Sequence, residues 1–251
     1  MSWSCLPVRS KEYHFKPRVD EHHFFKIGVC HDTDDEIEED CCTVKVPFLN
    51  EETTGFFGLF EGHRNGWSVA RAVSLYLHEL IQAEISLCQR PVDIRKCFET
   101  AFGKMDCNLK SSAFDRGASA TVCMVREYSD RTILYFANIG DTRAILNRGG
   151  KALRLTKDHT VFDEDEKSRL AASSAYKKSH QQVKSLVRQT RSFGDHALKQ
   201  WVISAPHFAE LELSPGDSQI LLISHKLCEM MEDQEMVDIA VGEGSRGTAW
   251  R

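Results

Sequence analysis

A short stretch in the first third of the chain combines an apolar run with residue types that can do chemistry. Residues 56–60 (FFGLF) are apolar apart from one glycine and predict a buried strand. The run ends in Glu61, Gly62 and His63. A carboxylate at the end of a buried strand is placed where it could hold a cation. The stretch marks a candidate site, and other acids must converge on it if a cation is to be held.

The elements that must position this site follow from the periodicity of the sequence. Apolar residues at helical spacing predict amphipathic helices over residues 68–87 and 92–109. Charged residues 161–172 and residues 232–240 predict two further helices. A hairpin turn is expected at Gly149-Gly150. Short β-rich segments predict strands over residues 24–30, 42–48, 55–60, 118–126, 132–139, 143–147, 208–213 and 219–224.

The composition of the chain excludes some classes of function. The chain has 251 residues, 41% of them hydrophobic, and a formal net charge of −5. Because there is no basic excess, we expect neither a nucleic-acid partner nor a membrane partner. We expect no signal peptide and no transmembrane segment, so the nine cysteines are predicted to be reduced thiols of a cytoplasmic or nuclear protein. No repeat or linker interrupts the pattern, which predicts a polar lead-in over residues 1–23 and one domain over residues 24–251.

Seven stretches, in order, resemble motifs of the metal-dependent type 2C Ser/Thr protein phosphatases. Any one of these motifs is weak evidence, but their order over most of residues 24–240 is specific. They are GLFEGH (58–63), RGASATV (116–122), ANIGDTRAIL (137–146), LTKDH (155–159), RQTRSFGD (188–195), VISAPHF (202–208) and QILLISHKLCEMMEDQEMVDI (219–239).

The resemblance implies a fold and a chemistry. The implied fold class is α+β: a four-layer α-β-β-α sandwich with two central, mostly antiparallel sheets flanked by helices. The implied chemistry uses two Mg²⁺ or Mn²⁺ ions at one end of the sandwich. Two such ions, roughly 3.5–4 Å apart, repel each other and require several converging carboxylates. The family supplies an early Glu-Asp pair, the Asp of D-G-H, the Asp of S-D-G and a C-terminal Asp, and an early arginine takes the phosphate.

Several of these positions depart from the family pattern. Glu61 replaces the bridging Asp, and its extra methylene moves the carboxylate by about 1–1.5 Å, enough to spoil octahedral Mg²⁺ geometry. The glycines of H-G-G are replaced by Arg64 and Asn65. S-D-G has become Ser224-His225-Lys226, and a neutral imidazole is a poor Mg²⁺ ligand.

Other positions retain only part of the pattern. Asp34 and Asp35 stand where the phosphate-binding arginine is expected, and acids there would repel a phosphate. The final motif is echoed by GSRGTAWR (244–251) with Gly247 in place of the Asp, so we expect the domain to be incomplete at its C-terminus, with the last core strand truncated. The residual candidate metal ligands are Glu39, Asp40, Glu61, the Gly62 carbonyl and Asp141.

Retained folding motifs with altered ligands predict a pseudophosphatase, inactive or strongly impaired, that holds no metal tightly and acts by binding a protein or phosphoprotein. No residue is then assigned a catalytic role, and Glu61, His63 and His225 are altered or residual positions. An active phosphatase with Mg²⁺ or Mn²⁺ on Glu39, Asp40, Glu61 and His225 is the main alternative. A Zn²⁺ site of Glu61, His63 and His225 is a third.

Overall fold

The computed structural model describes residues 18–21, 25–29, 40–88, 92–172 and 188–245. Its strands are β1 (Arg18–Glu21), β2 (Lys26–Val29), β3 (Asp40–Lys45), β4 (Gly55–His63), β5 (Gly117–Glu127), β6 (Thr132–Ile139), β7 (Arg143–Arg148), β8 (Lys151–Arg154), β9 (Phe193–Gly194), β10 (His207–Glu212) and β11 (Asp217–Ile223). Its helices are α1 (Trp67–Leu87), α2 (Ile94–Asn108), α3 (Glu164–Ala172), the 3₁₀ helix η1 (His196–Leu198), α5 (His225–Met230) and α6 (Asp233–Ser245).

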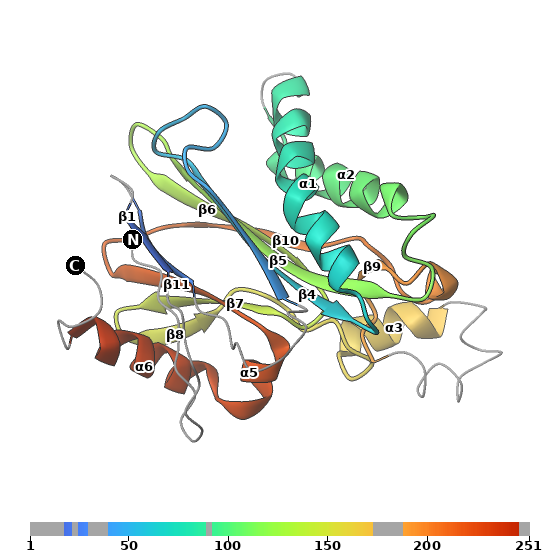
Figure 1. Ribbon diagram of the computed structural model, residues 1–251. Coiled ribbons are helices and arrows are strands. Elements are labelled where there is room, and N and C mark those ends of the chain that lie inside the picture. The colour runs from blue at the N-terminus through green and yellow to red at the C-terminus, as the bar shows by residue number, and fades with distance from the viewer. Residues whose placement is uncertain (1–17, 22–24, 30–39, 89–91, 173–187, 246–251) are drawn as a thin grey trace.

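Two antiparallel sheets form the centre of the fold (Figure 1). The larger sheet has the order β10-β6-β5-β4-β3, with β9 paired to β5, and the smaller has the order β11-β7-β8. Helices α1 and α2 cover the outer face of the larger sheet, and α5 and α6 lie along the smaller one (Figure 1). The α+β sandwich predicted from the sequence is confirmed.

Three apolar clusters separate these layers. The first lies between the larger sheet and α1 and α2, and contains Phe56 and Phe60. The second lies between the sheets and contains Phe57 and Ile220. The third lies between the smaller sheet and α6 and contains Leu221.

Alternation along β4 decides which way the candidate acid faces. Successive side chains of a strand point to opposite faces. Phe56 and Phe60 pack under the helices, whereas Phe57 packs between the sheets. Glu61 and His63 share the parity of Phe57 and therefore lie on the inter-sheet face, at the end of the strand.

Most predicted elements are present with shifted ends. The helix predicted over residues 161–172 begins at Glu164, because Asp163 caps it by accepting from the Glu166 amide at 3.0 Å. The strand over residues 219–224 alternates between two cores, as a sandwich strand must, and it pairs with β7.

Some elements were not predicted, and some predictions stay open. Strand β8 and helix α5 are short, and a segment of four to six residues carries little periodic signal. Strand β1 falls within the predicted lead-in and pairs with β2. The lead-in boundary at residue 23 stays a prediction. The expected loss of a C-terminal strand concerns residues mostly beyond those described, and it also stays a prediction.

Candidate functional site

Three neighbouring strands place polar side chains in one row at an end of the larger sheet. Asp40 is the cross-strand partner of Glu61, and Glu61 is the partner of Ser119. Directly opposed residues of an antiparallel pair project from the same face, with Cβ atoms about 4.5–5.5 Å apart. Asp40 and Glu61 thus form an acidic pair on the inter-sheet face.

Asp141 adds a third carboxylate from the turn between β6 and β7. Gly140 before it has φ +85°, a conformation that L side chains rarely adopt, and a Cβ there would meet Ser119. Asp141 is 1% exposed. Its Oδ1 accepts hydrogen bonds from Gln189 Nε2 at 2.5 Å and from Ser119 Oγ at 3.3 Å. The tight turn thereby buries this acid beside the row.

His225 reaches both Glu61 and Asp141 from the opposite sheet. It follows β11 and begins α5, where the first amides of a helix lack intrahelical partners. Its backbone N–H donates to Glu61 Oε2 at 2.8 Å, and its Nδ1 lies 3.3 Å from Asp141 Oδ2. On its outer side, Arg188 contacts both His225 Nε2 and the Glu229 carboxylate. His225 therefore contacts both acids, and its own ring is held by Arg188.

The pKa of Glu61 is shifted by its burial and by the neighbouring acids. Burial raises the pKa of its carboxyl to about 8, and the negative charges of Asp40 and Asp141 act in the same direction. The His225 backbone hydrogen bond and the charge of Lys226 oppose the rise. Near neutral pH, the folded protein therefore favours the protonated form of Glu61, chiefly because the carboxyl is buried.

His63 forms a separate pair beside this row. Its Nε2 lies 2.7 Å from Asp195 Oδ2, and Ser192 donates to the same oxygen at 2.7 Å. The hydrogen bonds of His63 and Ser192, together with the charge of Arg64, overcome burial and lower the pKa of Asp195. Gly117 makes room for the pair, since a Cβ at Gly117 would lie 2.6 Å from His63 Nε2. The arrangement orients an imidazole with a carboxylate, a unit that can move a proton.

The predicted residues divide into three groups. Asp40, Glu61, Asp141 and His225 come together, His63 lies beside them on Asp195, and Glu39 falls outside the described residues. The Zn²⁺ alternative gains no support: throughout the described ranges, no three His, Cys, Asp or Glu side chains are arranged to hold a metal ion. Sequence reasoning did not single out Arg188 and Gln189. The one feature of the sequence that could have pointed to them is their position in the stretch RQTRSFGD (188–195), which resembles a family motif.

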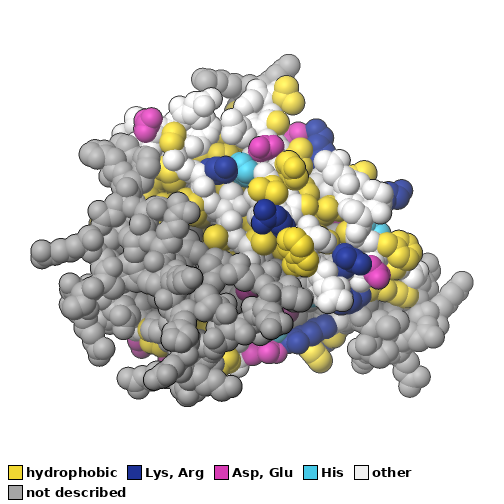
Figure 2. Space-filling model, in the orientation of Figure 1, with side chains coloured by type: hydrophobic (Ala, Val, Ile, Leu, Met, Phe, Trp, Pro, Cys, Tyr) yellow, Lys and Arg dark blue, Asp and Glu magenta, His cyan; other side chains and the backbone are white. Residues whose placement is uncertain are grey.

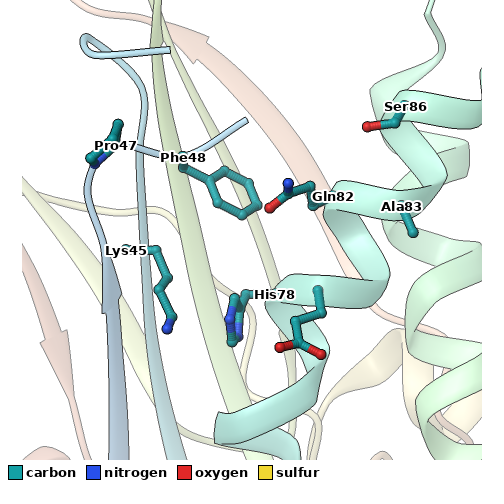
Figure 3. A pocket seen from close by; sticks show the side chains of 8 residues that line it. Lys45, Pro47, Phe48, His78, Gln82, Ala83 and Ser86 are labelled. Atoms are coloured by element: carbon teal, nitrogen blue, oxygen red, sulfur yellow. The ribbon is translucent and has the colours of Figure 1, made fainter. Parts of the chain in front are cut away.

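A cavity of about 490 Å³ lies elsewhere in the fold (Figure 3). It is bounded by Lys45, Pro47 and Phe48 on one side and by α1 residues, including His78 and Gln82, on the other (Figure 3). Lys45 is paired with Phe56, whereas Asp40 is paired with Glu61. Five residues of strand, about 17 Å, therefore separate the cavity from the acidic row, and the cavity is no part of the candidate site.

The fold and site define a class: an α-β-β-α sandwich with acids gathered where its sheets meet at one end. A family model described as Protein phosphatase 2C matches residues 26–247, and the chain belongs to this family. It is 33% identical over 207 residues to "Probable protein phosphatase 2C 32" of Oryza sativa subsp. japonica, covering 80% of this chain and 52% of the relative. It is 27% identical over 233 residues to "Protein phosphatase 2C homolog 1" of Saccharomyces cerevisiae, covering 86% and 82%.

Solved structures agree on the fold. The chain superimposes on "Structure of a C.elegans sex determining protein" with a TM-score of 0.71 at 13% identity, covering 92% of this chain and 56% of the other. It superimposes on a serine-threonine phosphatase 2C from Toxoplasma gondii with a TM-score of 0.69 at 15% identity, covering 96% and 87%. The chain spans about half the length of the plant relatives it matches. No described helix has the length and apolarity to cross a membrane.

Proposed function

We propose that this chain is a pseudophosphatase of the protein phosphatase 2C family, catalytically inactive or strongly impaired, which acts by binding a protein partner. The relatives that this chain resembles are protein phosphatases 2C, and the family is generally metal-dependent. The proposal concerns the metal centre. Its acids survive in part, but their contacts differ from those that two ions require.

The observation that carries the proposal is the position of His225. A two-metal centre needs carboxylates from several elements that converge on each ion. Here His225 contacts Asp141 through its ring and Glu61 through its backbone amide, where the resemblance implies an Asp. Lys226 adds a positive charge that acts on Glu61. We infer that these residues do not fit a two-metal centre, and we derive no catalytic step through metal.

One observation favours the alternative, an active Mg²⁺- or Mn²⁺-dependent phosphatase that hydrolyses phosphoserine or phosphothreonine. Burial raises the pKa of Glu61, the charges of Asp40 and Asp141 add to that rise, and a divalent cation would balance those charges. The His63–Asp195 pair would be available to move a proton. The two interpretations therefore differ in whether a cation displaces the His225 contacts.

The deciding experiment measures turnover and metal binding on the same sample. We expect hydrolysis of p-nitrophenyl phosphate and of a phosphothreonine peptide to stay at background with Mg²⁺ or Mn²⁺, and calorimetry to detect no saturable micromolar site. The Toxoplasma gondii phosphatase, whose fold the chain shares, is the positive control. Metal-dependent turnover that is abolished by Glu61→Ala would refute the proposal and establish the alternative.

The partner is proposed to be a protein, or a phosphoprotein recognised without hydrolysis. The formal net charge of −5 argues against nucleic acid or an anionic membrane surface as the partner. Over α1 and α2, apolar side chains are interspersed with basic ones (Figure 2). Leu75 and Tyr76 of α1 are about half exposed. This face is mixed in character, so it does not by itself identify the surface that a partner would use.

A further inference from the structure

A buried acid of helix α2 contacts the segment that carries Asp195. Asp106 lies near the C-terminal end of α2 and is 8% exposed. Its Oδ1 accepts hydrogen bonds from the Gly194 amide at 2.9 Å and from Lys199 Nζ at 2.8 Å. Lys199 Nζ also donates to the Ser192 carbonyl at 3.2 Å. Asp106 is therefore bonded, directly and through Lys199, to two residues that come just before Asp195.

Asp195 needs support from its surroundings because its backbone is strained. Its φ is +51°, in the left-handed region that residues other than glycine rarely adopt. Gly194 before it has φ +73°, and a Cβ there would collide with the Arg116 carbonyl oxygen. The same carbonyl accepts a hydrogen bond from the Asp195 amide at 2.8 Å. Strained conformations persist only where the surrounding contacts hold them, and Asp106 supplies one such contact at Gly194.

An apolar contact between α2 and β9 supports the same attachment (Figure 1). Phe102 lies one helical turn before Asp106, and its ring centroid is 5.1 Å from that of Phe193. Both rings are fully buried. Phe193 and Gly194, the two residues before Asp195, are therefore held by α2 through one apolar and one polar contact.

We propose that Asp106 is a positioning residue for the His63–Asp195 pair. By fixing the backbone of residues 192–195, it keeps the Asp195 carboxylate 2.7 Å from His63 Nε2. Helix α2 is then part of the candidate site, together with the strands that carry the acids. The inference goes beyond the proposed function and holds for a pseudophosphatase and for an active phosphatase alike, because it concerns only the geometry of the pair.

Two routes lead from Asp106 to the Asp195 carboxylate. One runs along the backbone from the Gly194 amide to the next residue. The other runs through Lys199 to the backbone of Ser192, whose hydroxyl donates to Asp195 Oδ2 at 2.7 Å. This is the oxygen that faces the imidazole. Loss of the Asp106 carboxylate would therefore loosen Asp195 from both sides.

The hydrogen bond between His63 and Asp195 gives a direct readout. Despite burial, hydrogen bonds from His63 and Ser192 lower the pKa of Asp195, so its carboxylate is ionised at neutral pH. His63 Nε2 therefore carries a proton and donates it to the carboxylate. In an NMR spectrum, the resonance of this ring proton reports the hydrogen bond, and its exchange with water reports how often the pair opens.

The test compares this resonance in the full-length chain and its variants. Asp106→Ala should move the His63 Nε2 proton upfield and speed its exchange about tenfold, the factor by which losing one hydrogen bond to a charged group changes an opening equilibrium. Asp106→Asn keeps the Oδ1 acceptor and should keep the wild-type resonance. Lys199→Met removes one of the two routes and should speed exchange by a smaller factor. Phe98→Leu is the matched control: its fully buried ring packs against Phe208, so it should lower the Tm and leave the resonance unchanged.

Two outcomes would overturn the proposal. One is a folded Asp106→Ala variant, checked by circular dichroism, that keeps the wild-type resonance and exchange rate. The other is an equal change in Phe98→Leu, which would trace the effect to general loss of stability. If Asp106→Ala does not fold, Lys199→Met decides, and a wild-type exchange rate in that variant refutes the proposal. No readout here is turnover or metal binding, so a failure of this proposal is distinguishable from a failure of the proposed pseudophosphatase function.

Discussion

At the scale of single residues, Glu61 is the acid of the site whose ionised form is most strongly disfavoured by burial and by nearby negative charges. Its carboxyl is partly buried with Asp40 and Asp141 within electrostatic reach. The protein offers one backbone hydrogen bond and the charge of Lys226 in return. A pKa raised from 4.5 to about 8 means that the folded state prefers the neutral acid. The contribution of Glu61 to the free energy of unfolding is then fully present below about pH 4.5 and is lost as the pH rises toward 8.

Glu61→Gln should therefore stabilise the protein at neutral pH. The amide carbonyl can still accept the His225 hydrogen bond, while the desolvated charge is removed. We expect the free energy of unfolding in EDTA at pH 7 to rise by about 1–3 kcal/mol, measured by urea denaturation. The gain should shrink toward zero at pH 4.5. A variant less stable than the wild type at pH 7 would contradict this account of Glu61.

His225→Asp, combined with Glu61→Asp, should create a metal response that the wild type lacks. The change removes the imidazole contact with Asp141 and adds a carboxylate facing the same acids. Without metal, the clustered charges should lower the Tm. With millimolar Mn²⁺, the Tm of the double variant should recover by several degrees, because a ligand that binds only the folded state stabilises it. An equal Mn²⁺-dependent shift in the wild type would show that His225 does not obstruct the site.

At the scale of elements, β11 and α5 bring the smaller sheet to the site. Ile220 and Leu222 point between the sheets, and Leu221 and Ile223 point toward α6. Strand β11 ends at Ile223, Ser224 follows, and helix α5 begins at His225. His225 therefore lies beside Glu61 and Asp141. The position of His225 therefore depends on the register of β11, which is fixed by its inward-facing apolar residues.

Ile220→Ala tests this dependence. Ile220 is fully buried between the sheets, so its truncation should lower the free energy of unfolding by about 2–4 kcal/mol. Leu222→Ala is the matched control on the same face of the same strand. Leu222 is only partly buried and should lose roughly half as much. Equal losses, measured by urea denaturation, would mean that the burial assigned along β11 is wrong.

At the scale of the whole molecule, buried polar groups tie the central sheets to the segment after residue 187. Glu166 is 1% exposed and accepts hydrogen bonds from Arg169 and Arg191, which lower its pKa to about 2 despite burial. His159 is 2% exposed, and neither of its ring nitrogens has a hydrogen-bond partner among the residues that the structure describes. Burial, with the charge of Arg191, lowers the pKa of His159 to about 3.

Acid should therefore destabilise the fold through His159. A depressed histidine pKa contributes stability that is present above the unfolded value of 6.5 and is lost as pH falls toward 3. Between pH 7 and 5, the wild type should lose about 1–2 kcal/mol more than His159→Leu in urea denaturation. His207, whose pKa is also lowered by burial, remains in the variant and leaves it with a residual slope. Parallel profiles for the two proteins would contradict the assignment.

The sequence by itself determined the sandwich, its main strands and helices, and the acids of the β3–β4 pair. Local periodicity and short motifs carry that information, because residues that pack together along one element repeat at a fixed spacing. Glu61 could be named in advance because it ends a predicted apolar strand, and Asp40 because the Glu39-Asp40 pair resembles an acidic motif of the family at about the right distance before the next strand. The short elements β8 and α5 could not, because so few residues give no period to recognise.

Only the tertiary structure decided what those acids contact. Glu61 and His225 are separated by 164 positions, Asp141 and Gln189 by 48, and His63 and Asp195 by 132. No local pattern specifies such pairs. They form because two sheets, each bound by its own hydrogen bonds, pack across a shared apolar core and bring their loops to the same end. The packing of the sheets therefore sets the charge balance around Glu61, which no residue near it in the sequence determines.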